Sequence, residues 1–437
     1  MIASLRVSFC LCCLLGLSCL VLSCSREEPE SPPLSVRMDA EDTREPISEY
    51  IYGQFIEHLG RCIYGGIWAE MLEDRKFFYE ITGDPEPWEL ITPGTSSWEG
   101  SGVSYEVLTK SPWLIVGEGG QVLMTGTDSF VGEHTPELIL PGSGRPYGIF
   151  QERLGLIEGG EYSGRAVLAG DPDAAPIDIS LVWGTGPTDR ATLTIRSLNE
   201  NFSTFEFNMR AGAATDDGHL EIAGRGKGSV RVGAVSLMPA DNVQGFRRDT
   251  LGLMQELNSP LDRWPGGNFV SGYDWKDGIG ERDRRPPRKN PAWKGIEPND
   301  VGIHEFLELS RLLNAEPLIV LNSGLGQVNS ALEQVAYVTG SSESGMGELR
   351  ATNGHPAPFR VKWWGIGNEM YGDWQLGHMP LADYAEKHNR FAEAILAENP
   401  DLRLIAVGSV GDWSREMLNL CADSMDLISE QVYLQDR

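Results

Sequence analysis

The sequence predicts an α/β protein, a (β/α)8 barrel that is interrupted after its first strand by a β-sandwich. From residue 241 onward strands alternate with helices, which is typical of a parallel sheet. Short strands without a long helical stretch fill residues 85–240, as in an antiparallel sandwich. An apolar strand over 361–367 ends in the polar pair Asn368 and Glu369. Catalytic groups of barrel enzymes stand at such strand ends.

The amino terminus predicts export. Arg6 precedes an apolar run over 7–22, so residues 1–23 are expected to be a signal peptide. The run ends in Val-Leu-Ser-Cys, which resembles a bacterial lipobox, so we expect cleavage before Cys24 and lipidation of its thiol. The alternative is an ordinary signal peptide cleaved near Ser23. Residues 24–44 are expected to tether the protein to the bacterial cell envelope; without the lipid it would be periplasmic or secreted.

Charge and composition exclude several classes. The chain has 437 residues, with 36 basic and 63 acidic side chains and a net charge of −27, which argues against a nucleic-acid partner. No metal-ligand spacing and no dinucleotide fingerprint occurs, so no cofactor is expected. After signal cleavage Cys24, Cys62 and Cys421 remain, too few for a disulfide framework. The membrane is expected as a partner only through the lipid anchor.

Residues 45–84 are expected to begin the barrel. The β-rich run 50–57 predicts the first strand, which delivers Glu57 to the barrel mouth. We interpret the neighbouring His58 as a structural hydrogen-bonding residue.

Residues 85–240 predict the inserted sandwich. Trp88, Trp98 and Trp183 could form a sugar-stacking platform, although an indole in a sandwich is more often part of the core. The sequence Asp216-Asp217-Gly218 predicts a hairpin turn. Eight alternating runs predict strands at 113–116, 137–140, 162–168, 177–183, 192–195, 202–207, 219–222 and 230–237.

Residues 241–437 predict the rest of the barrel, up to its sixth strand. A basic stretch over 281–294 is expected to be a solvated surface loop, and Asn299 or Asp300 is expected to cap the helix that follows. We expect strands at 261–264, 317–321, 361–367, 402–408 and 427–433, and helices at 246–257, from 303, from 328, at 381–395 and at 414–421.

The Asn368-Glu369 pair has aromatic neighbours, namely Trp363, Trp364, Tyr371 and Trp374. Aromatic walls around a carboxyl group suit stacking against sugar rings. Another polar residue, Asn268, follows the Pro-Gly-Gly break after the strand at 261–264.

Three blocks carry a family resemblance. Residues 364–375, Trp-Gly-Ile-Gly-Asn-Glu-Met-Tyr-Gly-Asp-Trp-Gln, closely resemble the acid/base motif of family 51 glycoside hydrolases, the α-L-arabinofuranosidases built on a (β/α)8 barrel. Residues 55–67 and 263–275 resemble the first two strands and loops of that family. The resemblance covers about 45–80 and 240–437, and the insertion resembles the carbohydrate-binding-like sandwich of extracellular members.

The resemblance implies a retaining glycosidase that releases non-reducing terminal α-L-arabinofuranosyl residues from arabinan or arabinoxylan. Such enzymes use two carboxyl groups about 5 Å apart. Glu369 is implied to be the acid/base and Asn368 to bind the 2-hydroxyl. The remaining substrate-binding residues are implied to be Glu57, Asn268, Trp374 and Tyr433.

The sequence departs from the family in two places. Gln431 stands where a His is expected, and the nucleophilic Glu is expected on strand seven, beyond the last residue. Strand alternation should turn Glu430 away from Gln431, toward the barrel wall. We therefore expect about six of eight barrel strands and an inactive 437-residue form. Alternatives are a family-51-like endoglucanase and a non-catalytic surface protein that binds carbohydrate.

Overall fold

The computed structural model describes residues 45–91, 105–343 and 345–432. The predicted signal peptide and tether, with Cys24, lie outside these residues, and so do Trp98 and Tyr433. Among the described helices, none combines the length and the apolar character needed to cross a membrane. The features below lie within one compact unit, which begins at Glu49.

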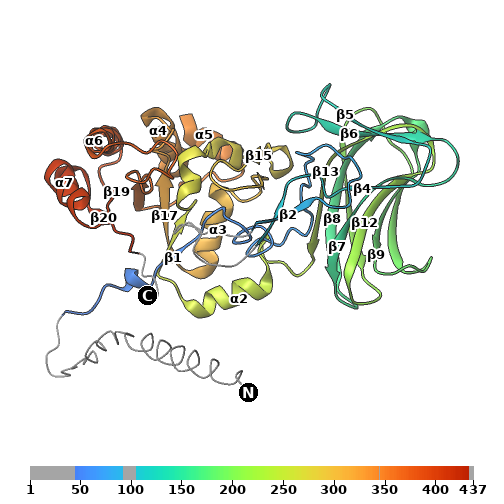
Figure 1. The fold of residues 1–437 in the computed structure, drawn as a ribbon, viewed down its shortest axis with the longest axis horizontal. Coiled ribbons are helices and arrows are strands. Elements are labelled where there is room, and N and C mark those ends of the chain that lie inside the picture. Colours follow the sequence, from blue (N-terminus) through green and yellow to red (C-terminus); the bar gives the residue numbers. More distant parts are fainter. Residues whose placement is uncertain (1–44, 92–104, 344, 433–437) are drawn as a thin grey trace, which may run out of the picture. The chain divides into compact units, whose positions relative to one another are not determined.

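A six-stranded parallel sheet forms the barrel part, as predicted (Figure 1). Neighbouring strands are paired in chain order, and every pair is parallel. The strands are β1 (Gln54–Phe55), β14 (Leu261–Trp264), β17 (Glu316–Leu321), β18 (Trp363–Ile366), β19 (Arg403–Val407) and β20 (Leu427–Ser429).

Helices connect these strands, as a parallel sheet requires. The predicted helices are all present, and one short helix that the sequence did not predict, α5, follows α4. The helices are α2 (Arg248–Leu257), α3 (Ile303–Leu313), α4 (Val328–Thr339), α5 (Gly345–Thr352), α6 (Leu381–Glu398) and α7 (Asp412–Cys421). Shorter 3-10 turns are η1 (Glu49–Tyr52), η2 (Pro172–Ala174), η3 (Asn268–Gly272), η4 (Trp275–Gly278), η5 (Arg282–Arg284) and η6 (Ala422–Ser424).

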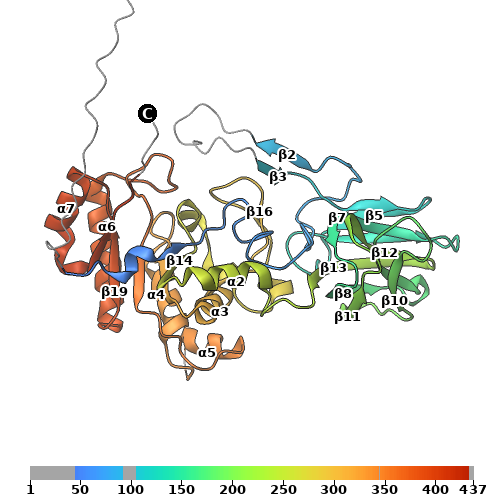
Figure 2. The ribbon, with the colours of Figure 1, turned by 90° about the horizontal axis from the view of Figure 1, so that it is seen from below.

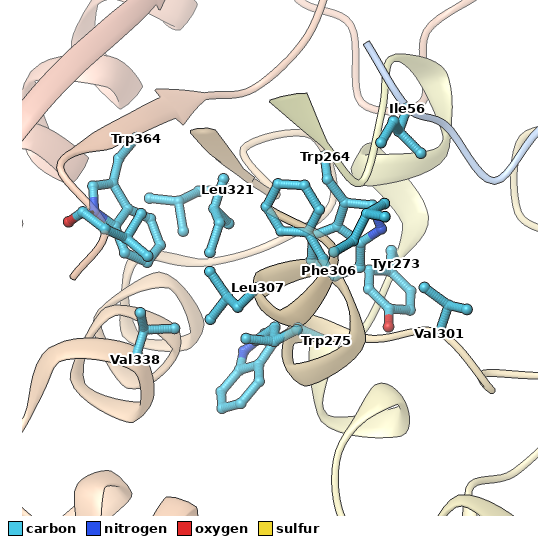
Figure 3. Packing of buried hydrophobic residues seen from close by; sticks show 14 of the residues in the cluster. Ile56, Trp264, Tyr273, Trp275, Val301, Phe306, Leu307, Leu321, Val338 and Trp364 are labelled. Carbon is cyan, nitrogen blue, oxygen red and sulfur yellow. Dashed lines mark hydrogen bonds between the residues drawn. The ribbon is translucent and has the colours of Figure 1, made fainter. Parts of the chain in front are cut away.

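The main barrel core lies between the sheet and its helices (Figure 3). Alternate strand residues such as Leu321 and Trp364 pack there against Phe306 of α3 and Val338 of α4. The intervening residues, such as Val320, belong to a separate cluster on the other face of the strands. Both faces of the sheet are therefore buried, which explains why these strands are apolar runs without alternation.

The insertion is a pair of five-stranded antiparallel sheets, coloured from cyan to yellow-green in Figure 1. Each of the eight predicted runs falls on a strand, so their prediction is confirmed. One sheet has the order β10 (Arg190–Ile195), β9 (Ile177–Val182), β12 (Thr215–Gly224), β7 (Tyr147–Leu156), β4 (Leu114–Val116). The other has the order β11 (Ser203–Arg210), β8 (Glu161–Gly170), β13 (Lys227–Pro239), β6 (Thr135–Pro141), β5 (Gln121–Thr125).

The sandwich core also takes in residues that precede the predicted boundary at 85. Leu72, Phe77 and Ile81 belong to the same buried cluster as both sheets. The two connections to the barrel lie side by side, since Met71 N–H donates to the carbonyl of Leu237 at 2.9 Å. Two small antiparallel pairs complete the strands: β2 (Trp88–Ile91) with β3 (Tyr105–Leu108), and β15 (Arg288–Lys289) with β16 (Ile296–Glu297).

The first strand and the cap of α3 differ from the prediction. The first strand is only β1, because residues 49–52 form the turn η1, in which Tyr50 reaches across to donate to Glu316 at 2.9 Å. Helix α3 is not capped by Asn299 or Asp300. Its N-cap is Gly302, whose N–H donates to the carboxylate of Glu305 at 2.9 Å, while the carboxylate of Asp300 is taken by other partners.

Two loop predictions are wrong. Residues 216–218 are not a turn but lie inside β12, where the register shifts at Gly218. A Cβ on Gly218 would lie 2.9 Å from the backbone carbonyl oxygen of Leu154 on β7, so the close approach of the two strands favours glycine there. The basic stretch is not a solvated loop either, because Asp283 and Arg285 are buried and Arg285 pairs with Glu305 at 2.9 Å.

Candidate active site

The end of β18 turns sharply out of the sheet at Gly367. Its φ of 87° is a conformation that glycine adopts freely, and a Cβ there would lie 2.0 Å from the hydroxyl oxygen of Ser323. Glu369 has a φ of 42°, which is uncommon for a residue with a side chain. The turn buries Asn368 and Glu369, with exposed fractions of 2% and 4%.

The carboxylate of Glu369 lies among two aromatic donors. The indole N–H of Trp374 donates to one oxygen at 2.9 Å, and the phenol of Tyr371 donates to the other at 3.3 Å. Of the four aromatic residues predicted to wall the site, these two do contact the carboxylate. Trp363 and Trp364 do not, since their indoles donate to Glu316 and to the carbonyl of Val361.

The amide of Asn368 has partners on both of its ends. Its oxygen accepts from Arg263 at 2.7 Å and from Gln431 at 3.4 Å. Its nitrogen donates to Asn268 at 3.3 Å and to Gln375 at 3.3 Å. These four bonds use the hydrogen-bonding capacity of the amide, so a sugar hydroxyl would have to replace one of them.

Glu57 comes from the segment after β1 and is buried in the same site. One carboxylate oxygen accepts from the backbone N–H of Phe269 at 3.0 Å and from the indole of Trp293 at 2.9 Å. A Cβ on Gly267 would lie 3.3 Å from the other oxygen and 3.5 Å from the amide nitrogen of Asn368. Gly267 therefore lies beside both of these polar groups.

His58 has a structural role, as predicted. The indole of Trp264 donates to its Nε2 at 2.9 Å, so the proton lies on Nδ1, which bonds to Glu297 at 2.7 Å. Glu297 also accepts from Tyr64 at 2.5 Å. Burial and then the charge of Glu297 raise the pKa of Tyr64 well above its usual value, which keeps this phenol a donor.

The last strand is shorter than predicted, since β20 ends at Ser429 and Glu430 and Gln431 follow it, but these two side chains do turn to different partners. Glu430 bonds to the hydroxyl of Ser414 on α7, whereas Gln431 turns to Asn368. Tyr433 lies outside the described residues.

Several polar contacts of the site were not predicted from the sequence. Arg263 precedes the buried Trp264 on β14, so strand alternation could have predicted that the two side chains lie on opposite faces. The site lies on the face of Arg263. Trp293 is the single tryptophan of the basic stretch, and nothing local indicates its bond to Glu57. Gln375 and Ser271 bond to each other and hold the turn after β18 against η3.

Comparison with known proteins identifies the segment that carries most of these residues. A family model described as the alpha-L-arabinofuranosidase 1 domain matches residues 253–436. Residues 253–436 belong to that domain family. Asn268, Asn368, Glu369 and Trp374 lie in this arabinofuranosidase domain, whereas Glu57 reaches it from outside the matched range.

Curated relatives match the same region. The chain is 40% identical over 185 residues to the probable alpha-L-arabinofuranosidase C of Aspergillus fumigatus, which covers 42% of this chain and 37% of that protein. It is 37% identical over 206 residues to an intracellular exo-alpha-(1->5)-L-arabinofuranosidase of Bifidobacterium longum, covering 46% of this chain and 36% of that protein. The chain thus spans little more than a third of the length of these relatives.

A solved structure extends the likeness beyond the arabinofuranosidase domain. The arabinose-bound MgGH51 α-L-arabinofuranosidase superposes with a TM-score of 0.65 at 18% identity. The superposition covers 82% of this chain and 59% of that one. The chain therefore has the fold of that protein over most of its length, a partial (β/α)8 barrel with a sandwich.

Proposed function

We propose that this protein is a retaining α-L-arabinofuranosidase in which Glu369 is the general acid/base. The observation that carries the proposal is the environment of Glu369. This carboxyl group is buried, is held by Trp374 and Tyr371, and lies in the matched arabinofuranosidase domain beside Asn368.

In the proposed mechanism the Glu369 carboxyl protonates the glycosidic oxygen as its bond to the anomeric carbon breaks. It then takes a proton from the water that hydrolyses the glycosyl-enzyme. The mechanism also needs an attacking carboxylate, which the family resemblance places on a seventh strand. The bonds from Trp374 and Tyr371 fix the direction in which the carboxyl of Glu369 points.

Glu57 and Asn268 are proposed to bind the arabinofuranosyl ring. Glu57 and Asn368 both lie beside Gly267, so hydroxyl groups of one small sugar can donate to Glu57 and exchange bonds with Asn368. Asn368 is already bonded to Asn268, and a 2-hydroxyl would bind by displacing that contact or the one from Gln431. The proposed substrates are arabinan or arabinoxylan and their oligosaccharides.

The test uses the natural full-length protein and two substrates, nitrophenyl α-L-arabinofuranoside and an arabinoxylan oligosaccharide. The oligosaccharide has a poor leaving group and needs the acid, so Glu369→Ala should lower its kcat by roughly 10²- to 10⁴-fold. The nitrophenyl substrate should lose less. Azide should restore turnover of the nitrophenyl substrate and give an arabinosyl azide.

The matched control is Glu430→Gln, because Glu430 bonds to Ser414 of α7 and should leave both rates unchanged. Loss of activity in Glu430→Gln, with Glu369→Ala active, would contradict the assignment. Turnover of nitrophenyl cellobioside instead would favour the endoglucanase alternative. Retention on arabinoxylan in affinity electrophoresis without any hydrolysis would favour a binding protein.

We also propose that the protein is exported and lipid-anchored through Cys24, on the basis of the lipobox-like sequence before it. Detergent phase partitioning of wild type and Cys24→Ala tests this. Wild type should enter the detergent phase and the variant the aqueous phase. Recovery of both in the aqueous phase would exclude the anchor.

A further inference from the structure

We propose a second carbohydrate subsite, centred on Trp88, for the neutral sugar chain that carries the arabinofuranosyl group. Trp88 lies on β2, which pairs with β3 (Figure 2), and its side chain lines two cavities. This inference rests on the proposed function, because it names where the rest of the substrate binds.

The subsite adjoins the candidate active site through Trp293. Trp293, whose indole donates to Glu57, also lines a cavity whose walls include His58, Arg61 and Trp88. A second cavity of about 380 Å³ shares Arg61 and Trp88 with the first and extends to Arg153 on β7 of the sandwich. The two cavities therefore form one hollowed surface that begins at Trp293, the hydrogen-bond partner of Glu57, and could take the chain that carries the arabinofuranosyl group.

The walls of this cavity combine an aromatic ring with paired charges. The guanidinium carbons of Arg61 and Arg153 lie 5.3 Å and 5.1 Å from the centroid of the Trp88 ring. Arg61 pairs with Glu73 at 3.2 Å, and Arg153 pairs with Glu106 at 3.0 Å. An indole surrounded by donors and acceptors suits a sugar, which has apolar C–H groups and many hydroxyls.

The charge of the cavity favours a neutral chain. Four carboxylates, from Glu73, Glu86, Glu106 and Glu152, line the second cavity together with only two guanidinium groups. Both guanidinium groups already have carboxylate partners. The excess of negative charge repels uronic acids and other anions. Xylan or arabinan backbones without acidic groups do not meet this repulsion.

The contacts around Trp88 are not needed to hold the barrel and the sandwich together. These are joined by a desolvated ionic cluster in which Arg75 pairs with Asp283 at 2.7 Å and with Asp300 at 2.6 Å. Around Trp88, in contrast, the arginine side chains are each 53% exposed and their glutamate partners 34% and 45%. Exposed pairs add little to stability, so an open, polar aromatic cluster here is better explained by binding.

The test compares kcat/KM on an arabinoxylan oligosaccharide and on nitrophenyl α-L-arabinofuranoside in the natural full-length protein. Trp88→Ala should lower the ratio of the two values by about tenfold, since only the oligosaccharide reaches Trp88. The matched control is Trp183→Ala, because Trp183 packs partly buried against the sandwich core and its loss should affect both substrates equally. Trp88→Phe should lower the ratio of the two kcat/KM values less than Trp88→Ala does.

An unchanged ratio in a folded Trp88→Ala protein would overturn the subsite, as would an equal loss in both tryptophan variants. If wild type hydrolyses neither substrate, the proposed function fails. The subsite is then tested by measuring binding instead of hydrolysis. In calorimetry with the arabinoxylan oligosaccharide, weaker binding to Trp88→Ala than to Trp183→Ala then supports it, and equal binding overturns it.

Discussion

Arg75 and Asp300 face each other through two parallel hydrogen bonds of 2.6 Å, and both side chains are only 1% exposed. Lys76 lies 2.9 Å from the same carboxylate. Arg75 also reaches Asp283, which accepts two bonds from Arg165 on β8. The sandwich and the barrel are therefore joined by buried charged side chains. Each of these charges is stabilised only by its ion-pair partners.

Asp300→Asn should destabilise the protein by about 3–5 kcal/mol at neutral pH, because it leaves Arg75 and Lys76 buried without a full counter-charge. Urea unfolding measures this. Asp249→Asn is the control, since Asp249 and its partner Arg247 are exposed and such a pair contributes about 0–1 kcal/mol. Equal losses in both variants would contradict the prediction.

The same cluster should make the protein acid-sensitive. Burial alone would raise the pKa of Asp283, but hydrogen bonds from Arg165 and the charge of Arg75 outweigh it and hold the pKa at about 2. Burial is likewise outweighed at Asp300, where Arg75 and Lys76 hold the pKa well below its usual value. A lowered folded-state pKa gives stability that is present above the unfolded value, near pH 4, and is lost as pH falls toward about 2. Asp300→Asn should lose less unfolding free energy over that range than wild type.

Asp262 should affect the pH dependence of stability in the opposite direction to Asp283 and Asp300. It is fully buried on β14, and neither oxygen makes a hydrogen bond of acceptable geometry within the described residues. Burial raises its pKa, and the nearby hydroxyl of Ser259 opposes the rise only in part. A raised folded-state pKa gives stability that is fully present below the unfolded value and is lost as pH rises through the folded one.

Asp262→Asn should therefore reduce the loss of unfolding free energy as the pH rises above about 4, which urea titrations at each pH would measure. Asp249→Asn again serves as the exposed control. Identical pH profiles for wild type and Asp262→Asn would contradict this assignment.

Trp374→Phe should lower kcat on an arabinoxylan oligosaccharide by about 10- to 100-fold, because a hydrogen bond to a charged group contributes roughly 1.5–3 kcal/mol. The ring is kept, and only the donor to Glu369 is lost. Trp363→Phe is the matched control, since the Trp363 indole donates to Glu316 instead. Equal rates for wild type and Trp374→Phe would show that this bond does not assist the reaction.

Gln431→His should introduce a new ionisation into the pH profile of kcat/KM, near the ordinary histidine value of about 6.5. The side chain faces Asn368, so a charge gained there acts directly on the site. Gln431→Leu removes the donor without adding a titrating group and should lower kcat/KM about two- to tenfold without changing the profile. Superimposable profiles for wild type and Gln431→His would contradict the placement of this residue.

The sequence predicted the features that depend on neighbouring residues. The apolar run of β18 followed by Gly367 places Asn368 and Glu369 at a strand end. The alternation expected over 427–433 also predicted that Glu430 and Gln431 turn to different partners, which they do although β20 ends at Ser429. The eight sandwich runs were recognised for the same reason, because a period of two along a strand is a local property. The family resemblance added the roles, which no periodicity encodes.

Only the tertiary structure decided which distant groups meet. Trp374 reaches Glu369 while Trp364 enters the core, although both lie close to it in sequence. Aspartate is a common helix N-cap residue, but Asp300 forms a buried ion pair with Arg75 instead. Local pattern determines the strand and its two faces, whereas a side chain's partner depends on which segments the fold brings within hydrogen-bonding distance, and that is a property of the whole packed chain.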